Sequence, residues 1–520
     1  MTAKQHYDVI IIGTGAGGGT LAYKLAPTGK KILILERGTY LPREKANWNA
    51  EAVYLHERYH TNEQWYDKDG KPFRPQMSYW VGGNTKVYGA ALLRLRERDF
   101  KQVTHLDGIS PEWPLKYQDF EPYYTAAEKL YSVHGEAGSD PTEPPRSEPY
   151  PYPPVSHERR MQEIADGIKK QGLAPFPLPL GLKLNEVDRH LSPCIRCETC
   201  DGYPCLVHGK ADAEVEGMRP ALQYPNVTLL TGAKVLRLVT DNSGQEIRIV
   251  ETEIAGEFLQ FQGDVVVMAC GAINSAALLL RSASDRHPSG LANRSDQVGR
   301  NYMKHLTMAL VQLSATPNPA VYQKTICVND YYWGEPDFPY PMGQVQNTGN
   351  VLIPPEAPPL LAPLAKLVPG VGWGQIETHS TGWWLQTEDL PDPNNRVRIV
   401  GEQLYLEYTP NNVEARDRLI HRWIEVLKAI DRTAEHVAFH HGIYPRSNTG
   451  IQVMGHQCGT CRFGEDSDKS VLDLHCRTHD IDNLYVVDGS FFPSNSGVNP
   501  TLTIIANALR VGDHLIERLK

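Results

Sequence analysis

The sequence predicts a mixed α/β fold that begins with a βαβ unit and ends with a strand, a loop and an amphipathic helix. At the N terminus a short apolar strand over residues 8–12 leads into GTGAGGGTLAYKLA and then KKILILERG, so the apolar pattern changes from continuous to helical and back. At the C terminus NLYVV has the pattern of a buried strand, and TLTIIANALRVGDHLIERL has helical periodicity. Of the 520 residues 41% are hydrophobic, which is enough for a large core and more than one domain.

Composition argues against several classes of function. The net charge of -9 comes without a basic run, so we expect no nucleic-acid partner. The longest apolar runs have the length of strands or are broken by proline, so we expect no membrane span. The first residues lack the pattern of a secretory signal, and we therefore expect a cytoplasmic protein whose nine cysteines are thiols or ligands rather than a disulfide framework.

Between the two ends the pattern changes along the chain. LKYQDFEPYYTAAEKLYSV and HERRMQEIADGIKKQG predict helices, whereas residues 226–241 and 246–271 alternate like an antiparallel meander that ends in a buried strand. From about residue 301 to residue 441 tryptophans and tyrosines gather among strands and proline-rich loops, which predicts a substrate domain. The apolar, proline-broken insert at residues 353–372 is either a packed surface loop or a lid or partner-docking segment.

The N-terminal glycines have the spacing of a dinucleotide-binding turn. Gly13, Gly15 and Gly18 form G-x-G-x-x-G between a strand and a helix, where they permit a tight turn, close approach of a pyrophosphate and close helix packing. Glu36 ends the second strand, where an acid can bind a ribose 2′-hydroxyl. An acid at this position argues against a 2′-phosphate, so the ligand is of the NAD or FAD type.

Further motifs decide between these two cofactors. VGGNTKVYGA, VVVMACGAINSAALLLRS, VGRNYMKH, HQCGT and VVDGSFFPSNSGVNPTLT together resemble the glucose–methanol–choline (GMC) family of FAD oxidoreductases. The resemblance implies an α/β plus α+β fold, with a discontinuous Rossmann-like FAD-binding domain and a substrate domain built on an antiparallel β-sheet. We assign residues 1–100, 190–300 and 445–520 to the FAD-binding domain, and residues 101–189 and 301–444 to the substrate domain.

The resemblance also implies the residues that bind FAD. They lie in the two glycine segments, in the meander and in the C-terminal loop: Gly13, Gly15, Gly18, Glu36, Gly82, Gly83, Asn84, Val235, Gly271, Asp488, Gly489, Asn499, Pro500 and Thr501. Some relatives attach FAD covalently to a histidine in the second glycine segment. Val87 and Tyr88 stand in that region here, so we expect FAD without a covalent link.

Oxidation of an alcohol by a flavin needs a base for the hydroxyl proton and a second polar group for the charge that develops on the oxygen. Histidine suits the first function because its ordinary pKa lies near neutrality. In the family these groups are a histidine in H-x-x-G-T and a histidine or asparagine in a loop of the type N/H-P-x-x-T. By this resemblance His456 is the base and Asn499 its hydrogen-bonding partner.

His456 also belongs to an H-x-C-x-x-C run with Cys458 and Cys461, which raises two other interpretations. A zinc site lacks a well-placed fourth ligand. A redox thiol pair needs its first cysteine at a helix N-terminus, and GTCRFGEDSD does not have a helical pattern. We therefore expect the two cysteines to pack and no metal to bind here.

A second cysteine cluster leaves several interpretations open. Cys194, Cys197, Cys200 and Cys205 form C-x-x-C-x-x-C-x4-C, whose last spacing departs from the bacterial ferredoxin pattern. Some sugar dehydrogenases of the family carry an iron–sulfur cluster in a comparable region. We expect structural thiols or local disulfides, with an iron–sulfur cluster or zinc as alternatives.

The substrate is an alcohol, and STGWWLQTEDLPDPNNRVRI resembles a segment of the sugar and glucoside oxidoreductases of the family. Aromatic faces stack on sugar rings and polar side chains pair with hydroxyls, so Trp383, Trp384, Gln386 and Glu388 are candidates for binding a sugar or glycoside. The alternative is an apolar or sterol-like alcohol with the insert as its lid. The resemblance implies oxygen or another electron acceptor as the second substrate.

Overall fold

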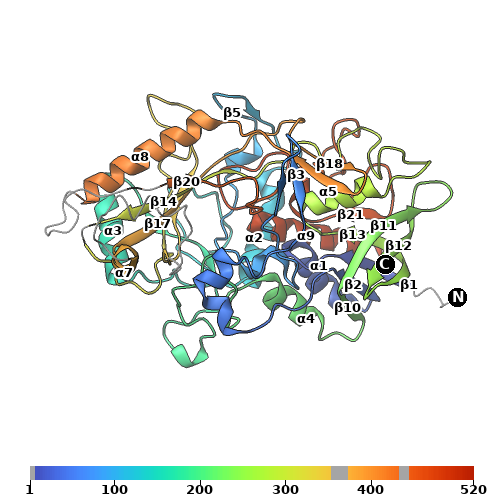
Figure 1. Ribbon diagram of the computed structural model, residues 1–520, viewed down its shortest axis with the longest axis horizontal. Helices are drawn as coiled ribbons and strands as arrows, with labels where there is room; N and C mark the ends of the chain where they lie inside the picture. The colour runs from blue at the N-terminus through green and yellow to red at the C-terminus, as the bar shows by residue number, and fades with distance from the viewer. Residues whose placement is uncertain (1–5, 315, 353–372, 432–443, 445) are drawn as a thin grey trace.

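Two sheets organise the molecule and lie toward opposite ends of it (Figure 1). The computed structural model describes residues 6–314, 316–352, 373–431, 444 and 446–520. In Figure 1 the larger sheet lies toward the right, and an antiparallel sheet lies toward the left beside the long helix α8 (Val413–Asp431). The insert at residues 353–372 lies outside the described residues.

The larger sheet has seven strands. Their order is β10 (Val227–Thr231), β2 (Ile32–Glu36), β1 (His6–Ile12), β13 (Glu257–Met268), β12 (Ile247–Ile254) and β11 (Ala233–Thr240), and β21 (Leu484–Val486) pairs along β13. β1 pairs in parallel with both β2 and β13, so the predicted βαβ unit is confirmed. β11, β12 and the first half of β13 form the predicted antiparallel meander. β10 was predicted to belong to this meander but does not. The chain turns at Gly232, which has a φ of 65° and follows β10, and β10 pairs in parallel with β2.

Helices pack around this sheet. α1 (Ala16–Leu25) follows the glycine turn and packs against α9 (Thr501–Arg518), which in turn packs against α2 (Tyr117–Leu130). α5 (Ala272–Arg281) follows β13 and packs against β11, and the single turn α4 (Arg219–Ala221) packs near α1. The helical patterns predicted for α2 and for the C-terminal helix are confirmed.

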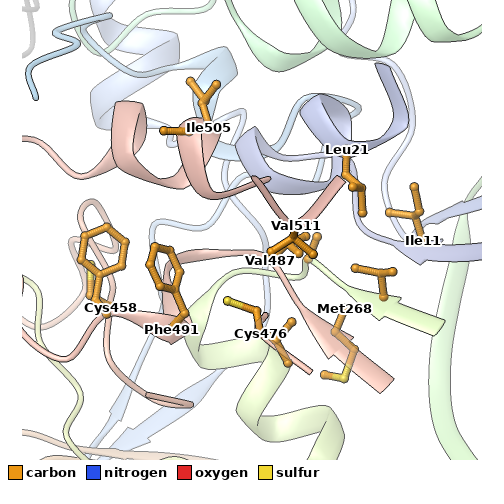
Figure 2. Close-up of a cluster of buried hydrophobic side chains, with 14 of the residues drawn as sticks. Ile11, Leu21, Met268, Cys458, Cys476, Val487, Phe491, Ile505 and Val511 are labelled. Atoms are coloured by element: carbon orange, nitrogen blue, oxygen red, sulfur yellow. The ribbon is translucent and has the colours of Figure 1, made fainter. Parts of the chain in front are cut away.

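The core of this part lies between the parallel strands and α1 and α9. Figure 2 shows Ile11 of β1, Leu21 of α1 and Val511 of α9 in one buried cluster. Cys458 and Cys476 are fully buried in the same cluster. Burial of an aliphatic side chain of this size contributes about 1.5–3 kcal/mol, so the cluster holds the strands and the helices together.

The second sheet has six strands and is antiparallel throughout. Its order is β20 (Arg446–Asn448), β14 (Leu306–Leu313), β17 (Ser380–Thr387), β16 (Gln344–Asn347), β15 (Ile326–Val328) and β8 (Phe176–Pro177). α8 packs on β14 and β17, α3 (Arg159–Lys169) packs on α8, and α7 (Trp373–Thr378) precedes β17. Trp383 of β17 meets Trp423 of α8 at a ring-centroid distance of 4.8 Å, at the centre of a second core.

Three small sheets complete the fold of the described residues. They are the four-stranded β18 (Arg396–Val400), β19 (Gln403–Glu407), β3 (Trp65–Asp67) and β4 (Pro72–Phe73), and the pairs β5 (Val103–Thr104) with β6 (Ile109–Ser110) and β7 (Val133–His134) with β9 (Leu180–Gly181). β19 pairs in parallel with β3, although more than 300 residues separate them. No helix of the described residues is both long enough and apolar enough to cross a membrane.

The position of α2 bears on the division of the chain into domains. The boundaries drawn from the sequence place α2 with the antiparallel sheet. In the structure α2 packs on α9, and its buried residues Phe120 and Tyr124 belong to the core of the parallel sheet. We therefore keep the two-domain division as a proposal in which α2 joins the dinucleotide-binding part.

Candidate active site

A cavity of about 1580 Å³ is lined by residues of both sheets. The carboxyl ends of β1 and β2 and the start of α5 form one part of its wall. β14 and β17 of the antiparallel sheet form another part, and His456 and Asn499 lie on the wall as well. Pockets for small ligands commonly measure about 300–1,000 Å³, so this cavity has room for a dinucleotide and a second molecule.

The glycine turn after β1 takes the conformation that its spacing predicts. Gly13 has a φ of 98°, and a Cβ there would lie 2.4 Å from the carbonyl oxygen of Ala269 on the neighbouring strand. At Gly15 no protein atom lies within 4 Å of an added Cβ, which leaves the backbone open toward the cavity. At Gly18 an added Cβ would lie 2.1 Å from the carbonyl oxygen of Gly13, so this glycine serves packing and does not line the cavity.

Glu36 lies at the end of β2, buried beside this turn. Its carboxylate accepts hydrogen bonds from the backbone N–H of Thr14 at 3.1 Å and from that of Gly38 at 2.8 Å. Burial raises the pKa of Glu36 despite these hydrogen bonds. A buried carboxylate at the cavity wall is suited to accept hydrogen bonds from ribose hydroxyls.

The second glycine segment packs directly on the first. The backbone N–H of Gly82 donates to the hydroxyl of Thr14 at 3.0 Å, and a Cβ on Gly83 would lie 3.1 Å from Cα of Gly15. Gly83 and Asn84 line the cavity, whereas Gly82 lies behind it. Asn84 also accepts a hydrogen bond from the backbone N–H of Ser78 at 3.0 Å. The two glycine segments therefore form one continuous part of the wall.

Asp488 connects the loop after β21 to the start of α5. Its buried carboxylate accepts hydrogen bonds from the backbone N–H of Gly271 at 3.0 Å, from that of Ser490 at 2.9 Å and from the hydroxyl of Ser275. Burial raises the pKa of Asp488. The other predicted cofactor residues of this region also line the cavity: Val235, Gly271, Gly489, Asn499, Pro500 and Thr501.

These residues fit an FAD molecule. The backbone at Gly15 is open where a pyrophosphate must approach, and Glu36 is a buried acceptor one strand away. Gly83, Asp488 and Thr501 continue the wall toward His456. Twelve of the fourteen predicted cofactor residues line the cavity, and Gly18 and Gly82 shape it from behind.

His456 is held in an unusual backbone conformation. Its φ of 63° lies in the left-handed region, which residues with a Cβ adopt rarely. Cys458 exchanges backbone hydrogen bonds of 2.9 and 3.1 Å with Met303, and the N–H of Gly459 donates to the carbonyl of Gly489 at 3.0 Å. Two neighbouring segments thus fix the turn that directs His456 to the cavity wall.

A chain of amides leads away from the imidazole. Nδ2 of Asn499 lies 3.2 Å from Nε2 of His456. Oδ1 of Asn499 accepts a hydrogen bond from Nε2 of Gln346 at 3.0 Å. Gln346 belongs to β16, so the chain connects the imidazole to the antiparallel sheet. The two predicted catalytic residues are therefore adjacent, although 43 positions separate them in the sequence.

The surroundings keep His456 neutral. Burial lowers its pKa well below the ordinary value of 6.5, and nearby His305, Lys324 and Lys304 lower it further. The ring of His305 stands edge-on to that of His456 with a centroid distance of 5.0 Å. Burial lowers the pKa of His305 to about 4, and its Nε2 lies 2.9 Å from the carbonyl oxygen of Ser496. Both rings are uncharged at neutral pH, so His456 has a nitrogen that can accept a proton.

Two family models match the chain, both described as GMC oxidoreductase, over residues 7–307 and 391–508. Together they span most of its length. The chain belongs to the GMC oxidoreductase family. It is accordingly an FAD-dependent oxidoreductase that acts on CH–OH groups, and the predicted family, fold and cofactor are confirmed.

Relatives of this GMC oxidoreductase extend over its whole length. 6'''-Hydroxyparomomycin C oxidase of Streptomyces lividus is 31% identical over 100% of this chain and 93% of its own. Paromamine 6'-oxidase of Streptomyces fradiae is 29% identical over 97% of this chain and 90% of its own. Among solved structures, pyridoxine 4-oxidase from Mesorbium loti has a TM-score of 0.67 at 18% identity and covers 98% of this chain and 99% of its own, which shows the shared fold.

The four residues predicted to bind substrate are separated in the structure. Atoms of both tryptophans line the cavity. Because β17 alternates and the ring of Trp383 packs against Trp423 in the second core, the side chain on the cavity side is that of Trp384. Gln386 is fully buried, and its Nε2 donates to the carbonyl oxygen of Gly497 at 2.8 Å.

Glu388 lies beyond the end of β17 and is buried as well. Its carboxylate accepts a hydrogen bond from the hydroxyl of Ser110 at 2.7 Å and lies 3.2 Å from Nε2 of His105. Neither Gln386 nor Glu388 lines the cavity. Of the four residues we carry only Trp384 forward as a candidate for substrate contact.

The cysteines of the H-x-C-x-x-C run lie in the core of the GMC oxidoreductase. Cys458 and Cys461 are fully buried, and burial raises the pKa of both thiols well above the ordinary value. Cys458 appears in Figure 2 among apolar side chains. Such thiols are poor nucleophiles and poor metal ligands, which favours packing as their function.

The second cysteine cluster lies near the cavity. Cys194 and Cys200 are buried, and burial raises the pKa of their thiols to about 12 and about 11. No cysteine forms a disulfide in the structure. Within the described ranges no group of three or more His, Cys, Asp or Glu side chains is arranged to hold a metal ion. The arrangement supports structural thiols, which stays a proposal.

Three residues of the site were not singled out from the sequence: His305, Lys324 and Gln346. His305 ends the VGRNYMKH motif, so a signal was present but carried no assigned function. Lys324 lines the cavity and forms an ion pair with Asp201. Gln346 and Lys324 lie in a part of the chain without a motif, and only the pairing of β15, β16 and β17 places them beside His456.

Proposed function

We propose that this GMC oxidoreductase oxidises a CH–OH group of a sugar or glycoside, with His456 as the base and Asn499 as its hydrogen-bonding partner. The observation that carries the proposal is the 3.2 Å contact between His456 Nε2 and Asn499 Nδ2 at the cavity wall. An alcohol oxygen needs an acceptor for its proton and a donor for the charge that it develops, and this pair supplies both.

The residues of the chain support the proton-transfer half of the reaction. A neutral His456 accepts the hydroxyl proton at Nε2, and the amide N–H of Asn499 then donates to the oxygen. The positive charges of Lys304 and Lys324 lie close enough to lower the pKa of His456, and they also stabilise negative charge on the substrate oxygen. FAD, when bound, supplies the acceptor for the hydride that leaves the carbinol carbon.

The cavity wall favours a polar, ring-shaped substrate. Trp384 presents an aromatic face. β16 and the residues that follow it add polar groups, namely Gln346, Thr348 and Asn350. Aromatic stacking with flanking hydrogen bonds suits a pyranose ring. The two Streptomyces relatives are named for amine-bearing glycosides, which extends the substrates worth testing to aminoglycosides.

The test is anaerobic mixing of the purified, FAD-loaded protein with a panel of alcohols, followed by the loss of the oxidised-flavin absorbance. The panel contains D-glucose, methyl D-glucopyranoside, paromamine and 1-dodecanol. We expect a sugar or aminoglycoside to reduce the flavin faster than 1-dodecanol at equal concentration. Faster reduction by 1-dodecanol would contradict the proposal and favour an apolar alcohol.

A further inference from the structure

Gln346 connects the substrate side of the cavity to the catalytic pair. In β16 the side chains alternate, so Gln344 and Gln346 share one face, while Val345 packs into the second core on the other. Gln346 lies directly opposite Trp384 in the sheet register, and both line the cavity. The carboxamide is 1% exposed, and its Nε2 donates to Asn499.

We propose that Gln346 is a substrate-binding and positioning residue. Its Nε2 fixes the amide of Asn499 in the orientation that leaves His456 Nε2 unprotonated, and its Oε1 accepts a hydrogen bond from a hydroxyl or ammonium group of the substrate. The first part concerns the protein alone. The second part rests on the proposed function.

The first part follows from the direction of the hydrogen bonds. Gln346 Nε2 also lies 3.4 Å from Oε1 of Gln344, so its amino group faces two acceptors. Turning the Gln346 amide over by itself would place oxygen against oxygen at Gln344. In the structure Asn499 directs its Oδ1 to Gln346 and its Nδ2 to His456. Because Nδ2 can only donate, His456 Nε2 is the acceptor and its ring proton lies on Nδ1.

The second part follows from the other atom of the same carboxamide. Among the described residues Gln346 Oε1 is buried and has no hydrogen-bond partner. A buried acceptor without a partner is unfavourable, and Gln346 forms part of the cavity wall beside the catalytic pair. A donor on the bound substrate removes this cost. Because Gln346 and Trp384 are opposite each other in the register, their side chains share one face of the sheet, and a ring stacked on the indole would lie near the Gln346 carboxamide.

The first test reads the tautomer of His456 directly. Protein labelled with ¹⁵N-histidine is studied by long-range ¹H–¹⁵N NMR, and the signals of His456 are assigned by their absence in His456→Gln. We expect an unprotonated Nε2 in the wild type. Gln346→Glu offers only acceptors, so Asn499 must reverse and Nε2 must carry a proton. Gln344→Glu adds the same charge on the same strand face but keeps an acceptor toward Gln346, so it should preserve the wild-type tautomer.

If Gln346→Glu fails to fold, as judged by circular dichroism, Gln346→Leu replaces it. Leucine cannot form the hydrogen bond to Asn499, so the Asn499 amide is free to turn over, and we expect both tautomers of His456. A protonated Nε2 in the wild type would overturn the proposal. The same tautomer in the wild type and in the folded Gln346 variant would overturn it as well.

The second test combines Gln346→Leu with monodeoxy analogues of methyl D-glucopyranoside, and the apparent Kd comes from the concentration dependence of flavin reduction. One deoxy position should weaken binding to the wild type by about tenfold, and the variant should not distinguish that analogue from the parent. Gln344→Glu, which keeps an acceptor toward Gln346 at a position that does not line the cavity, should keep the wild-type pattern. If Gln346→Leu weakened the binding of the parent glycoside and of every deoxy analogue by the same factor, the second part would be overturned.

The two tests also separate this inference from the proposed function. A wild-type flavin that no sugar reduces contradicts the proposed function, while the NMR experiment still decides the function of Gln346 in the catalytic pair. A different result is that sugars reduce the wild-type flavin while Gln346→Leu distinguishes every deoxy analogue as the wild type does. That result contradicts only the proposed substrate contact.

Discussion

At the scale of single residues, the proposed mechanism depends on the protonation state of His456 and on the groups that control it. The imidazole is buried, lies near two lysines and contacts an amide donor at Nε2. Each of these features favours the neutral ring. The neutral imidazole that the proposed mechanism needs is therefore present before substrate binds.

Replacing His456 by alanine removes the proton acceptor without touching the glycine turns that hold FAD. We expect His456→Ala to retain FAD and to slow flavin reduction by about 10²–10⁴-fold, as loss of a general base usually does. Stopped-flow reduction under anaerobic conditions measures this. Reduction at the wild-type rate in the variant would show that another group takes the proton.

Asn499→Ala should have a smaller effect than His456→Ala. The variant removes a hydrogen-bond donor and leaves the base in place, so we expect slower reduction with an unchanged FAD content. The same stopped-flow experiment compares the two. A loss equal to or greater than that of His456→Ala would reverse the functions that we assign to the two residues.

His305 links the site to the pH dependence of stability. Its pKa is about 4 in the folded protein and about 6.5 when unfolded, so between these values only the unfolded state binds the proton. Stability is therefore highest above pH 6.5 and falls below it, by about 1.4 kcal/mol per pH unit for this one group. His305→Gln keeps a donor for Ser496 and removes the titration.

Urea unfolding of the wild type and of His305→Gln across this pH range measures the effect. We expect a shallower loss of unfolding free energy in the variant as the pH falls. Parallel curves for the two proteins would contradict the assignment of a depressed pKa to His305.

At the scale of elements, the glycine turn after β1 provides a matched pair of substitutions. Gly15 has a φ of -65°, which alanine adopts, and an added Cβ meets no protein atom within 4 Å. Gly15→Ala should fold with wild-type stability but bind FAD weakly, because the methyl group occupies the space open for the pyrophosphate. Gly18→Ala should instead be destabilised, since its Cβ would lie 2.1 Å from a backbone oxygen. Thermal unfolding and FAD titration distinguish them, and normal FAD affinity in Gly15→Ala would contradict this assignment.

The second glycine segment is the basis for the proposal that FAD binds without a covalent link. Val87 and Tyr88 line the cavity where some relatives carry an attachment histidine, and Tyr88 donates its hydroxyl to the carbonyl oxygen of Ala211. We expect acid precipitation to release the yellow colour into the supernatant. Colour that stays in the pellet would indicate a covalent link.

Local patterns predicted these elements well because each depends on neighbouring residues. β1, α1 and β2 follow from periodicity and glycine spacing, and α2 and α3 follow from their apolar stripes. The surroundings of Gln386 and Glu388 were less predictable. Their partners, Gly497 and His105, lie more than 100 positions away in the sequence. A polar residue on a strand has the same sequence signal whether it meets a ligand or a buried partner.

At the scale of the whole molecule, the active site depends on segments that only the complete fold brings together. The cysteine-rich segment meets the antiparallel sheet at the ion pair of Asp201 with Lys324, beside the cavity. Tyr54 adds a hydrogen bond to the carbonyl oxygen of Asp201 at 3.2 Å. No local pattern predicted this contact, since its partners are separated by 123 and 147 positions.

A substitution in this cysteine-rich segment tests the function of the cysteine cluster. Cys197 is partly buried and accepts a weak hydrogen bond from the hydroxyl of Thr199. We expect Cys197→Ser to lower thermal stability slightly, with an unchanged visible spectrum and unchanged turnover per folded enzyme. Iron and acid-labile sulfide assays on the wild type give the direct control. Near-stoichiometric iron would contradict the interpretation as structural thiols.

The pairing of β1 has a consequence for how the protein is made. Ile12 of β1 pairs with Met268, and β21, which completes the parallel strands, ends at Val486. The first apolar strand therefore leaves the ribosome long before its central partner exists, and at about 5–20 residues per second the wait lasts tens of seconds. His456 and Asn499 are also synthesised after Met268. During that interval the nascent chain exposes an unpaired apolar edge, and such edges are prone to aggregation until their partner strand arrives.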